Sequence, residues 1–377
     1  MNERPRADRE GAAARRLRSA PRMRSRLHLL AAALTFTVAT EAAASPAVDG
    51  TRNLSLGNAS RGSSYGTNAV LANPSNMGFS GTFAIEPLYQ LQLASRTSGV
   101  GVVVMDSLNN ARVSLGLGYL FMRGQPTIKY TDPGTSEDDE FELSRFGHEA
   151  FAAISIMIVK QWLAVGLKPK YQYASLRYRD DTGAARDAAG KLSTFGLDAS
   201  LTANLAGFAA VALVATNLTG NNDPAYTDDD DLALEGVGID PAAVRYGSLS
   251  ELSEYPLGFA WGASVFPLRK ADFSLNADGY YDFSSFRFEK ATRQVYGGSA
   301  EFVAGPVPLR FGATWDSRGK GKQDDRVFVS GGIAYVRPAP VGGVGVDIGF
   351  GFSQQVAGPL KDTIIGFNLG LRIHPDL

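Results

Sequence analysis

The chain has 377 residues, 37 of them Lys or Arg against 38 Asp or Glu, and it contains no cysteine. The absence of cysteine excludes disulfides, thiolate metal sites, a cysteine nucleophile and a lipoprotein anchor. A net charge of -1 argues against bulk electrostatic binding of nucleic acid. Glycine is frequent, at 42 residues, whereas the hydrophobic share of 44% is ordinary.

The first residues are predicted to be a secretory signal. The first 26 residues contain nine arginines, an apolar stretch follows at 27–40, and small residues come next. This order is typical of a cleaved signal peptide, and the apolar stretch is too short to span a bilayer as a helix. We expect residues 1–44 to be removed, with Ala47 as the second choice of cleavage site. If translation starts at Met23, which gives a basic region of normal length, residues 1–22 are not translated.

After residue 80 the sequence alternates with a period of two. In the segment Val344–Ser353, valine, isoleucine and phenylalanine alternate with glycine and polar residues, and the segment 362–373 repeats the pattern. Successive side chains of a strand point to opposite faces, so one face of each strand is apolar. A soluble β-sandwich also alternates. Segments of this length, aromatic residues at their ends and a small, polar opposite face favour a membrane barrel instead.

The expected fold class is therefore all-β, a transmembrane antiparallel β-barrel at 81–377 with about fourteen strands. Boundaries read from a sequence are good to a few residues. The expected strands are 81–95, 98–107, 111–123, 145–159, 162–179, 193–204, 207–216, 255–266, 271–283, 293–304, 306–316, 326–337, 342–353 and 362–373.

Short and long connections between these strands alternate almost throughout. The longest connection is the acidic segment Asn217–Glu254, whereas the connection at Lys160–Gln161 is short. Bacterial barrels have an even number of strands, short periplasmic turns and longer external loops. The alternation predicts a protein of the outer membrane of a Gram-negative bacterium, with both termini in the periplasm.

Residues 45–80, ahead of the first strand, do not alternate and are rich in Gly, Ser and Asn. A helical turn is expected at Thr67–Ala72, with Thr67 as its N-cap, and Asn73 should end it because the residue before a proline avoids the helical region. A disordered periplasmic tail is one interpretation of this segment. Apolar residues such as Leu54 and Val70 favour the other, a hatch folded into the barrel.

Two motifs in this segment resemble a known family. Arg52, Leu54, Leu56, Gly57 and Ala59 form an Arg-x-Leu-x-Leu-Gly-x-Ala lead, and an Asn-Pro-Ser motif stands directly before the first strand. Together they resemble the FadL-type outer-membrane transporters of long-chain fatty acids and other hydrophobic compounds, the FadL/TodX superfamily. Those proteins are monomeric barrels of fourteen strands whose N-terminal hatch carries Asn-Pro-Ala. The residues of this chain that match the hatch motif are Asn73, Pro74 and Ser75, with serine in place of the alanine.

The resemblance implies an outer-membrane channel for hydrophobic small molecules such as long-chain fatty acids, gated by the hatch. Related PorV-like barrels share a similar lead and strand number but act as partners in protein secretion or surface attachment, and a general porin is a third alternative. In FadL-type transporters the route is thought to leave sideways through a gap in the wall. Small residues in the first three strands suit such a gap or make room for the hatch: Pro87, Gly99, Gly101, Gly116 and Gly118.

Polar side chains on the lumen face of the expected strands are candidate ligand-binding residues. A carboxylate ligand favours Arg or Lys, and the other role for these groups is to line water and to pair with Asp and Glu across the lumen. The predicted site consists of these polar lumen residues and the hatch lead, Arg52, Leu56, Gly57 and Ala59. The lumen candidates are Glu86, Gln90, Arg112, Lys168, Asp278, Arg310 and Arg372.

Other motifs carry little chemistry. His148 and Ser144 lie close in sequence, but no third residue completes a hydrolytic triad, so we expect no enzyme. Acidic runs such as Asp228–Asp231 lack the spacing of a calcium loop, and we expect no metal and no cofactor. The expected partners are outer-membrane lipid, a hydrophobic small-molecule ligand and the barrel-assembly machinery that inserts the chain as a monomer, with no nucleic acid.

Overall fold

A computed structural model of the chain divides into two units, residues 1–37 and 38–377. The predicted signal peptide and the alternative start at Met23 lie outside the described residues. So do most of the long connections, including the acidic run at 228–231. The structure describes residues 48–373 except 95, 109, 111, 126, 132–137, 180–184, 187–190, 220–256, 269–271, 284–291, 318–324, 338–342 and 359–360.

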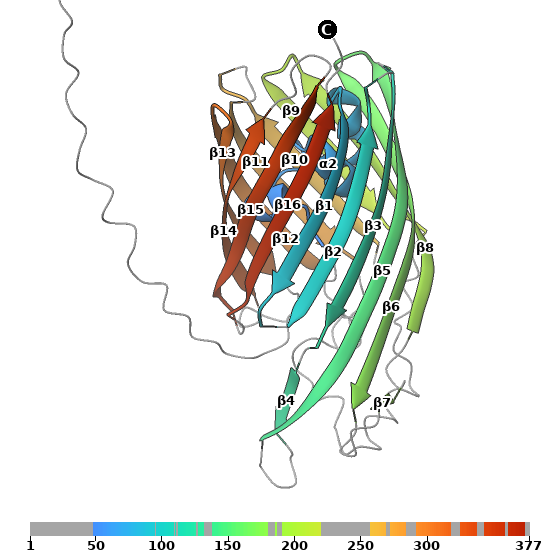
Figure 1. Ribbon diagram of the computed structural model, residues 1–377, viewed down its shortest axis with the longest axis vertical. Helices are drawn as coiled ribbons and strands as arrows, with labels where there is room; N and C mark the ends of the chain where they lie inside the picture. The colour runs from blue at the N-terminus through green and yellow to red at the C-terminus, as the bar shows by residue number, and fades with distance from the viewer. Residues whose placement is uncertain are drawn as a thin grey trace, which may run out of the picture. The chain divides into compact units, whose positions relative to one another are not determined.

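The described residues form a closed antiparallel barrel of fourteen long strands (Figure 1). Each strand pairs with its neighbour in the chain, and β1 pairs with β16 to close the ring. The barrel strands are β1 (Phe83–Gln92), β2 (Thr97–Asp106), β3 (Val113–Gly124), β5 (Asp138–Val159), β6 (Leu163–Arg179), β8 (Lys191–Leu205), β9 (Ala209–Thr216), β10 (Gly258–Val265), β11 (Phe273–Asp282), β12 (Arg293–Ala304), β13 (Val307–Ser317), β14 (Arg326–Arg337), β15 (Val344–Ala357) and β16 (Thr363–Ile373).

Two short strands, β4 (Thr127–Thr131) and β7 (Ala185–Arg186), pair with the ends of β5 and β6 and are not part of the ring. The prediction of an antiparallel barrel with about fourteen strands is confirmed. The largest boundary difference is in β5, which begins at Asp138 instead of residue 145 because it extends beyond the ring to pair with β4 (Figure 1).

The period of two places apolar residues on the outer surface of the barrel. Leu117 is 61% exposed and Phe195 is 74% exposed, while the alternate positions Gly116 and Gly196 face inward against other side chains. An exposed apolar belt on a closed barrel is typical of a surface that contacts lipid. Because the inner row is small and polar, the hydrophobic share of the whole sequence stays ordinary.

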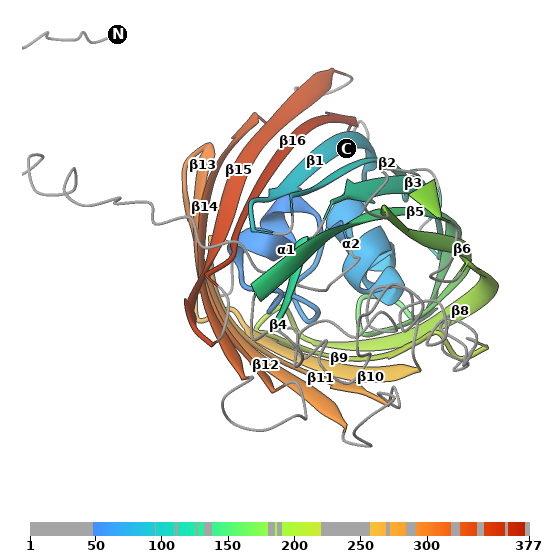
Figure 2. The same ribbon diagram turned by 90° about the horizontal axis from the view of Figure 1, so that it is seen from below.

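An N-terminal segment, Val48–Ser80, lies inside the ring (Figure 2). It contains α1 (Thr51–Ser55), α2 (Thr67–Ala72) and the 3-10 helix η1 (Pro74–Phe79). Among the described residues, no helix is long and apolar enough to cross a membrane.

The N-terminal segment runs along the lumen from the half that contains the β1–β2 turn to the opposite end of the barrel. Val48 contacts Gly99, close to the turn between β1 and β2. Thr82, which follows the segment, donates from Oγ1 to the carbonyl of Ile373 at 3.0 Å, at the end of the barrel where β1 begins and β16 finishes. The segment therefore spans much of the lumen before the first strand starts.

The expected helix at Thr67–Ala72 is present, and Asn73 is its C-cap. The expected N-cap is wrong, because Gly66 occupies that position with a φ of 60° and Thr67 is the first helical residue. Thr67 uses its hydroxyl for a tertiary contact, donating to the buried carboxylate of Glu86 in β1. Glycine adopts a positive φ at little cost, so the chain can turn into α2 without a side-chain cap.

Candidate functional site

The Asn-Pro-Ser motif docks the N-terminal segment onto the wall formed by β5, β6 and β8. Asn73 Nδ2 donates to Thr202 Oγ1 at 2.9 Å, and the backbone N–H of Ser75 donates to Ser200 Oγ at 2.9 Å. From β5, Ser155 Oγ donates to the carbonyl of Ser75 at 3.0 Å. These polar groups are buried. Burial removes their hydrogen bonds to water, and each hydrogen bond described here replaces one of them. The motif is therefore a polar anchor between the segment and three strands.

A methyl group at Gly166 in β6 is expected to loosen this anchor. A Cβ at that position would lie 2.7 Å from the carbonyl carbon of Pro74, so the backbone of the segment would have to shift. Overpacking of this kind costs about 1–3 kcal/mol. We expect Gly166→Ala to speed protease cleavage within the segment of the folded barrel. Gly298→Ala in β12, where the nearest atom lies 3.9 Å away, is the control; equal cleavage rates in the two variants would contradict the expectation.

The hatch lead occupies the opposite part of the lumen. Leu56 is fully buried, and Gly57 ends α1 in the left-handed region with a φ of 57°. The hydroxyl of Thr314 in β13 donates to the carbonyl of Gly57, and Ser299 Oγ in β12 donates to the carbonyl of Ala59 at 2.6 Å. The lead thus fixes the turn after α1 to β12 and β13 through backbone carbonyls.

Arg52 joins α1 to the same strands through a buried ionic cluster. Its Nε donates to Glu301 Oε2 at 3.2 Å, and Arg310 Nε donates to Glu301 Oε1 at 2.8 Å. All three side chains are almost fully buried. The Arg52 guanidinium also lies over the ring of Tyr65, 4.6 Å from its centroid. One carboxylate therefore holds a cation from the segment and a cation from the wall.

The predicted acceptors Glu86, Gln90 and Asp278 all face the lumen and are buried. Each accepts hydrogen bonds from the N-terminal segment, so they hold protein groups and not free solvent. Asp278 Oδ2 accepts two backbone N–H groups at 3.0 and 2.9 Å. The donors in the segment are Thr67 for Glu86, the backbone N–H of Asp49 for Gln90, and Ser60 with Arg61 for Asp278.

The predicted cations Lys168, Arg310 and Arg372 also lie in the lumen, and each pairs with an acid. Lys168 and Arg310 are buried, whereas Arg372 is partly exposed. The sequence predicts such pairing but does not identify the acids. Their signal was available, because each acid occupies an inward position in the alternation of its own strand. The partners are Asp198 for Lys168, Glu301 for Arg310 and Asp347 for Arg372.

Arg112 is the exception among the predicted lumen residues. The strand starts at Val113, not at residue 111, so Arg112 lies in the turn before β3. Its side chain is exposed, and its backbone N–H donates to Asn110 Oδ1 at 2.9 Å. The prediction that Arg112 lines the lumen is therefore corrected.

Apolar side chains from the segment pack against one side of the wall. This inner apolar cluster combines Val70 and Met77 of the segment with residues of β1, β2, β3 and β5. Two of the predicted small residues make room for the segment, since Gly99 contacts Val48 and Gly116 contacts Val70. The cluster consists of Val48, Ala69, Val70, Leu71, Met77, Leu88, Val103, Met105, Leu120, Phe151 and Ala153.

On the other side of the same wall is an apolar outer hollow of about 570 Å³. The aromatic side chains of Tyr119, Tyr171 and Phe195 line its sides. The small residues Ala150 and Ala152 also line it and leave the space between the aromatic rings open. Phe151 belongs both to the lining of the hollow and to the inner apolar cluster, and its ring packs on Gly118. The Phe151 side chain therefore separates buried apolar residues inside the barrel from the lipid-facing surface.

The backbone ladder between β5 and β6 is interrupted at this place. Phe151 pairs with Lys170 and Ile154 pairs with Leu167, but the two positions between them in each strand do not pair. Pro169 lies in the gap, and proline has no N–H to donate to a ladder. A similar interruption lies beside Pro87, between β1 and β16. The outer hollow lies over the interruption at Pro169.

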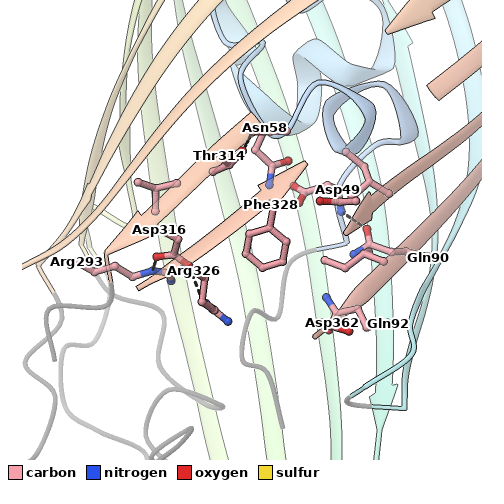
Figure 3. A pocket seen from close by; sticks show the side chains of 15 residues that line it. Asp49, Asn58, Gln90, Gln92, Arg293, Thr314, Asp316, Arg326, Phe328 and Asp362 are labelled. Carbon is pink, nitrogen blue, oxygen red and sulfur yellow. Dashed lines mark hydrogen bonds and ion pairs between the residues drawn. The ribbon is translucent and has the colours of Figure 1, made fainter. Parts of the chain in front are cut away.

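A polar cavity of about 100 Å³ lies between α1 and the wall strands β1, β12, β13, β14, β15 and β16 (Figure 3). Arg293 and Arg326 both pair with Asp316 on its wall, at 2.8 and 2.6 Å. The ring of Phe328 faces the space beside them. Among the described residues, no group of three or more His, Cys, Asp or Glu could hold a metal ion.

Asp49 lines this polar cavity from the segment. Burial raises the pKa of the Asp49 carboxyl above its ordinary value, against the opposing charge of Arg61 and a hydrogen bond from Asn53. A carboxyl whose pKa is raised on folding stabilises the fold most when it is protonated, and that contribution is lost as the pH rises through the raised pKa. The ionised form of Asp49 is therefore unfavourable where it lies.

Asp49→Asn is accordingly expected to raise the free energy of unfolding at neutral pH. The gain should shrink as the pH falls through the raised pKa towards the ordinary value near 3.8, because the wild-type carboxyl then becomes neutral as well. Chemical denaturation of both proteins at several pH values measures the difference. A difference that stays constant with pH would show that the effect does not come from ionisation of Asp49.

No protein-family model matches the chain, and no curated protein is significantly similar to it in sequence. Solved structures do resemble it. The CymD monoaromatic hydrocarbon channel superposes with a TM-score of 0.59 at 13% identity over 87% of this chain and 98% of that one. The Ralstonia pickettii toluene transporter TbuX gives 0.57 at 11%, and a Pseudomonas aeruginosa FadL homologue gives 0.53 at 12%, each over 86% of this chain and 98% of the other. The chain has the FadL-type fold.

Within this FadL-type fold, the departure of the third motif residue has a structural explanation. Serine replaces the alanine of Asn-Pro-Ala, and Ser75 Oγ donates to Asn73 Oδ1 at 2.7 Å. The same hydroxyl lies 2.7 Å from Thr202 Oγ1. The hydroxyl thus adds a polar link between the motif and β8 that an alanine cannot make.

Proposed function

We propose that this protein is an outer-membrane channel that carries hydrophobic small molecules across the outer membrane of a Gram-negative bacterium. The FadL-type fold supports it, because the similar structures include channels and transporters named for monoaromatic hydrocarbons and toluene. The observation that carries the proposal is the arrangement at Phe151, where buried apolar residues inside the barrel meet the outer hollow across an interrupted part of the wall.

In this proposal the N-terminal segment, with residues 45–80 as its expected limits, acts as the hatch. It places buried polar and apolar groups across the lumen, so a solute cannot pass while it is seated. When the hatch moves, an apolar solute can enter the space beside the inner apolar cluster and leave sideways past Phe151 into the membrane. The proposed substrates are apolar molecules such as long-chain fatty acids or aromatic hydrocarbons.

The orientation follows the strand parity. β1 begins and β16 ends at the same end of the barrel, whereas β9 ends and β10 begins at the other end. We assign the first end to the periplasm and the second to the outside, with the channel acting as a monomer. A cysteine added at the end of β16 should then be shielded from an impermeant maleimide on intact cells; its labelling without permeabilisation would reverse the orientation.

Uptake by whole cells tests the proposed function. In a strain that depends on this protein, we expect radiolabelled long-chain fatty acid or toluene to enter faster with the full chain than with an empty vector. A chain lacking residues 45–80 should change that uptake, provided that heat-modifiability on a gel shows a folded barrel. The proposal is wrong if the full chain leaves the uptake of every apolar solute unchanged, or if removing the segment has no effect on it.

A further inference from the structure

The Lys168 side chain in β6 connects the N-terminal segment to the wall at Phe151. Its Nζ donates to the carbonyl of Leu71 in α2 at 3.0 Å and pairs with Asp198 Oδ2 in β8 at 3.0 Å. The same ammonium lies 5.4 Å from the centroid of the Phe151 ring in β5. One buried cation therefore contacts the segment and the strands on both sides of its own.

We infer that Lys168 couples the position of α2 to the closure of the wall between β5 and β6, as a positioning residue that keeps Phe151 in place while the segment is seated. This inference rests on the proposed function, for which it identifies the residue that controls closure of the wall. It concerns the part of the wall where Pro169 interrupts the ladder, so side chains, not backbone hydrogen bonds, hold β5 and β6 together there.

The contact with Leu71 is what makes the coupling sensitive to the segment. In a short helix the last carbonyls lack intrahelical partners, and Lys168 supplies a charged donor to one of them. A charge-assisted hydrogen bond is stronger than a neutral one, and a buried cation that loses an oxygen partner is unfavourable. When α2 moves away, Lys168 has to find another partner, and the side chain can no longer hold its place beside the Phe151 ring.

Lys170 provides a matched control two residues along the same face. Its Nζ pairs with Asp198 Oδ1 at 2.8 Å, and it is as deeply buried as Lys168. Within the described part of the chain, Lys170 makes no hydrogen bond to the N-terminal segment. Any effect that comes from removing a cation beside Asp198 is therefore common to both residues, whereas coupling to α2 is specific to Lys168.

Hydrogen exchange of the whole barrel in lipid nanodiscs tests the inference without any substrate. We expect Lys168→Met to speed amide exchange in peptides covering 149–156 and 165–172 about tenfold relative to Lys170→Met, since it removes a charged hydrogen bond beside an interrupted ladder. Lys168→Arg, which keeps a donor, should return the exchange towards that of the wild type. Equal exchange in Lys168→Met and Lys170→Met would overturn the inference.

The outcomes separate the inference from the proposed function. If exchange differs between the two lysine variants but the wild type carries no apolar solute, the coupling exists and the transport proposal fails. If the wild type carries solute and the exchange is equal, transport stands and the role of Lys168 is wrong. Folding of each variant is checked by heat-modifiability, and Lys168→Arg supplies the comparison if Lys168→Met does not fold.

Discussion

Replacing Glu301 with alanine is expected to release the N-terminal segment and to lower the stability of the barrel strongly. The carboxylate accepts from Arg52 in α1 and from Arg310 in β13, and all three groups are buried. Its removal leaves two guanidiniums without their acid in the lumen. Breaking a buried ionic cluster by deleting one partner costs about 3–5 kcal/mol, one of the largest effects that a single substitution produces.

Denaturant unfolding from lipid vesicles measures the loss, and protease cleavage within the segment reports its release. Asp316→Ala is the matched control, because Asp316 also lies between two arginines but both belong to the wall. We expect both variants to lose stability and Glu301→Ala alone to expose the segment to protease. If the segment stays as resistant in Glu301→Ala as in the wild type, Arg52 does not anchor it.

Locking α2 to the wall is expected to stop uptake of every apolar substrate. A Cβ added at Gly116 would lie 2.8 Å from Cγ1 of Val70, so the double variant Val70→Cys/Gly116→Cys places a sulfur of one residue close to the Cβ of the other. This proximity suits a disulfide. The natural chain contains no cysteine, and the engineered pair therefore has no competing thiol. Under oxidising conditions, uptake should fall to the level of cells without the protein.

Reduction with a membrane-permeant thiol should restore uptake in the same cells, which separates locking from misfolding. The two single-cysteine variants provide the controls, because neither can form the bridge. The pair Ala277→Cys/Gly298→Cys joins two neighbouring wall strands that face each other in the register and should leave uptake unchanged. Persistent uptake by the oxidised Val70→Cys/Gly116→Cys protein would mean that solute passes without movement of α2.

The strands were predictable because a barrel in a bilayer imposes one simple rule on each of them. Lipid demands apolar residues on one face, and the lumen accepts glycine and polar residues on the other, so the alternation is visible without any knowledge of pairing. The strand at 326–337 was predicted with its final bounds. Arg112 was misplaced because strand ends are set by turn geometry, here the side chain of Asn110 capping the turn, and alternation does not mark them.

The interior was predictable only in part. The Asn-Pro-Ser motif indicated where α2 stops, since proline restricts the residue before it. The partners of the motif could not be read from the sequence, because Asn73 and Thr202 are 129 residues apart and meet only when the ring closes. The same holds for Arg52 and Glu301, which are 249 residues apart. The interruption beside Pro169 has a visible signal, a proline within an alternating strand, but the outer hollow depends on side chains from five strands.

The course of the N-terminal segment has a consequence for how the molecule is built. The segment precedes every strand in the sequence. Its anchors nevertheless lie on β8, β11, β12 and β13, which are synthesised after it. The segment therefore cannot take its final position until these later strands have been made and have met it in the lumen, so its seating belongs to a late step of assembly.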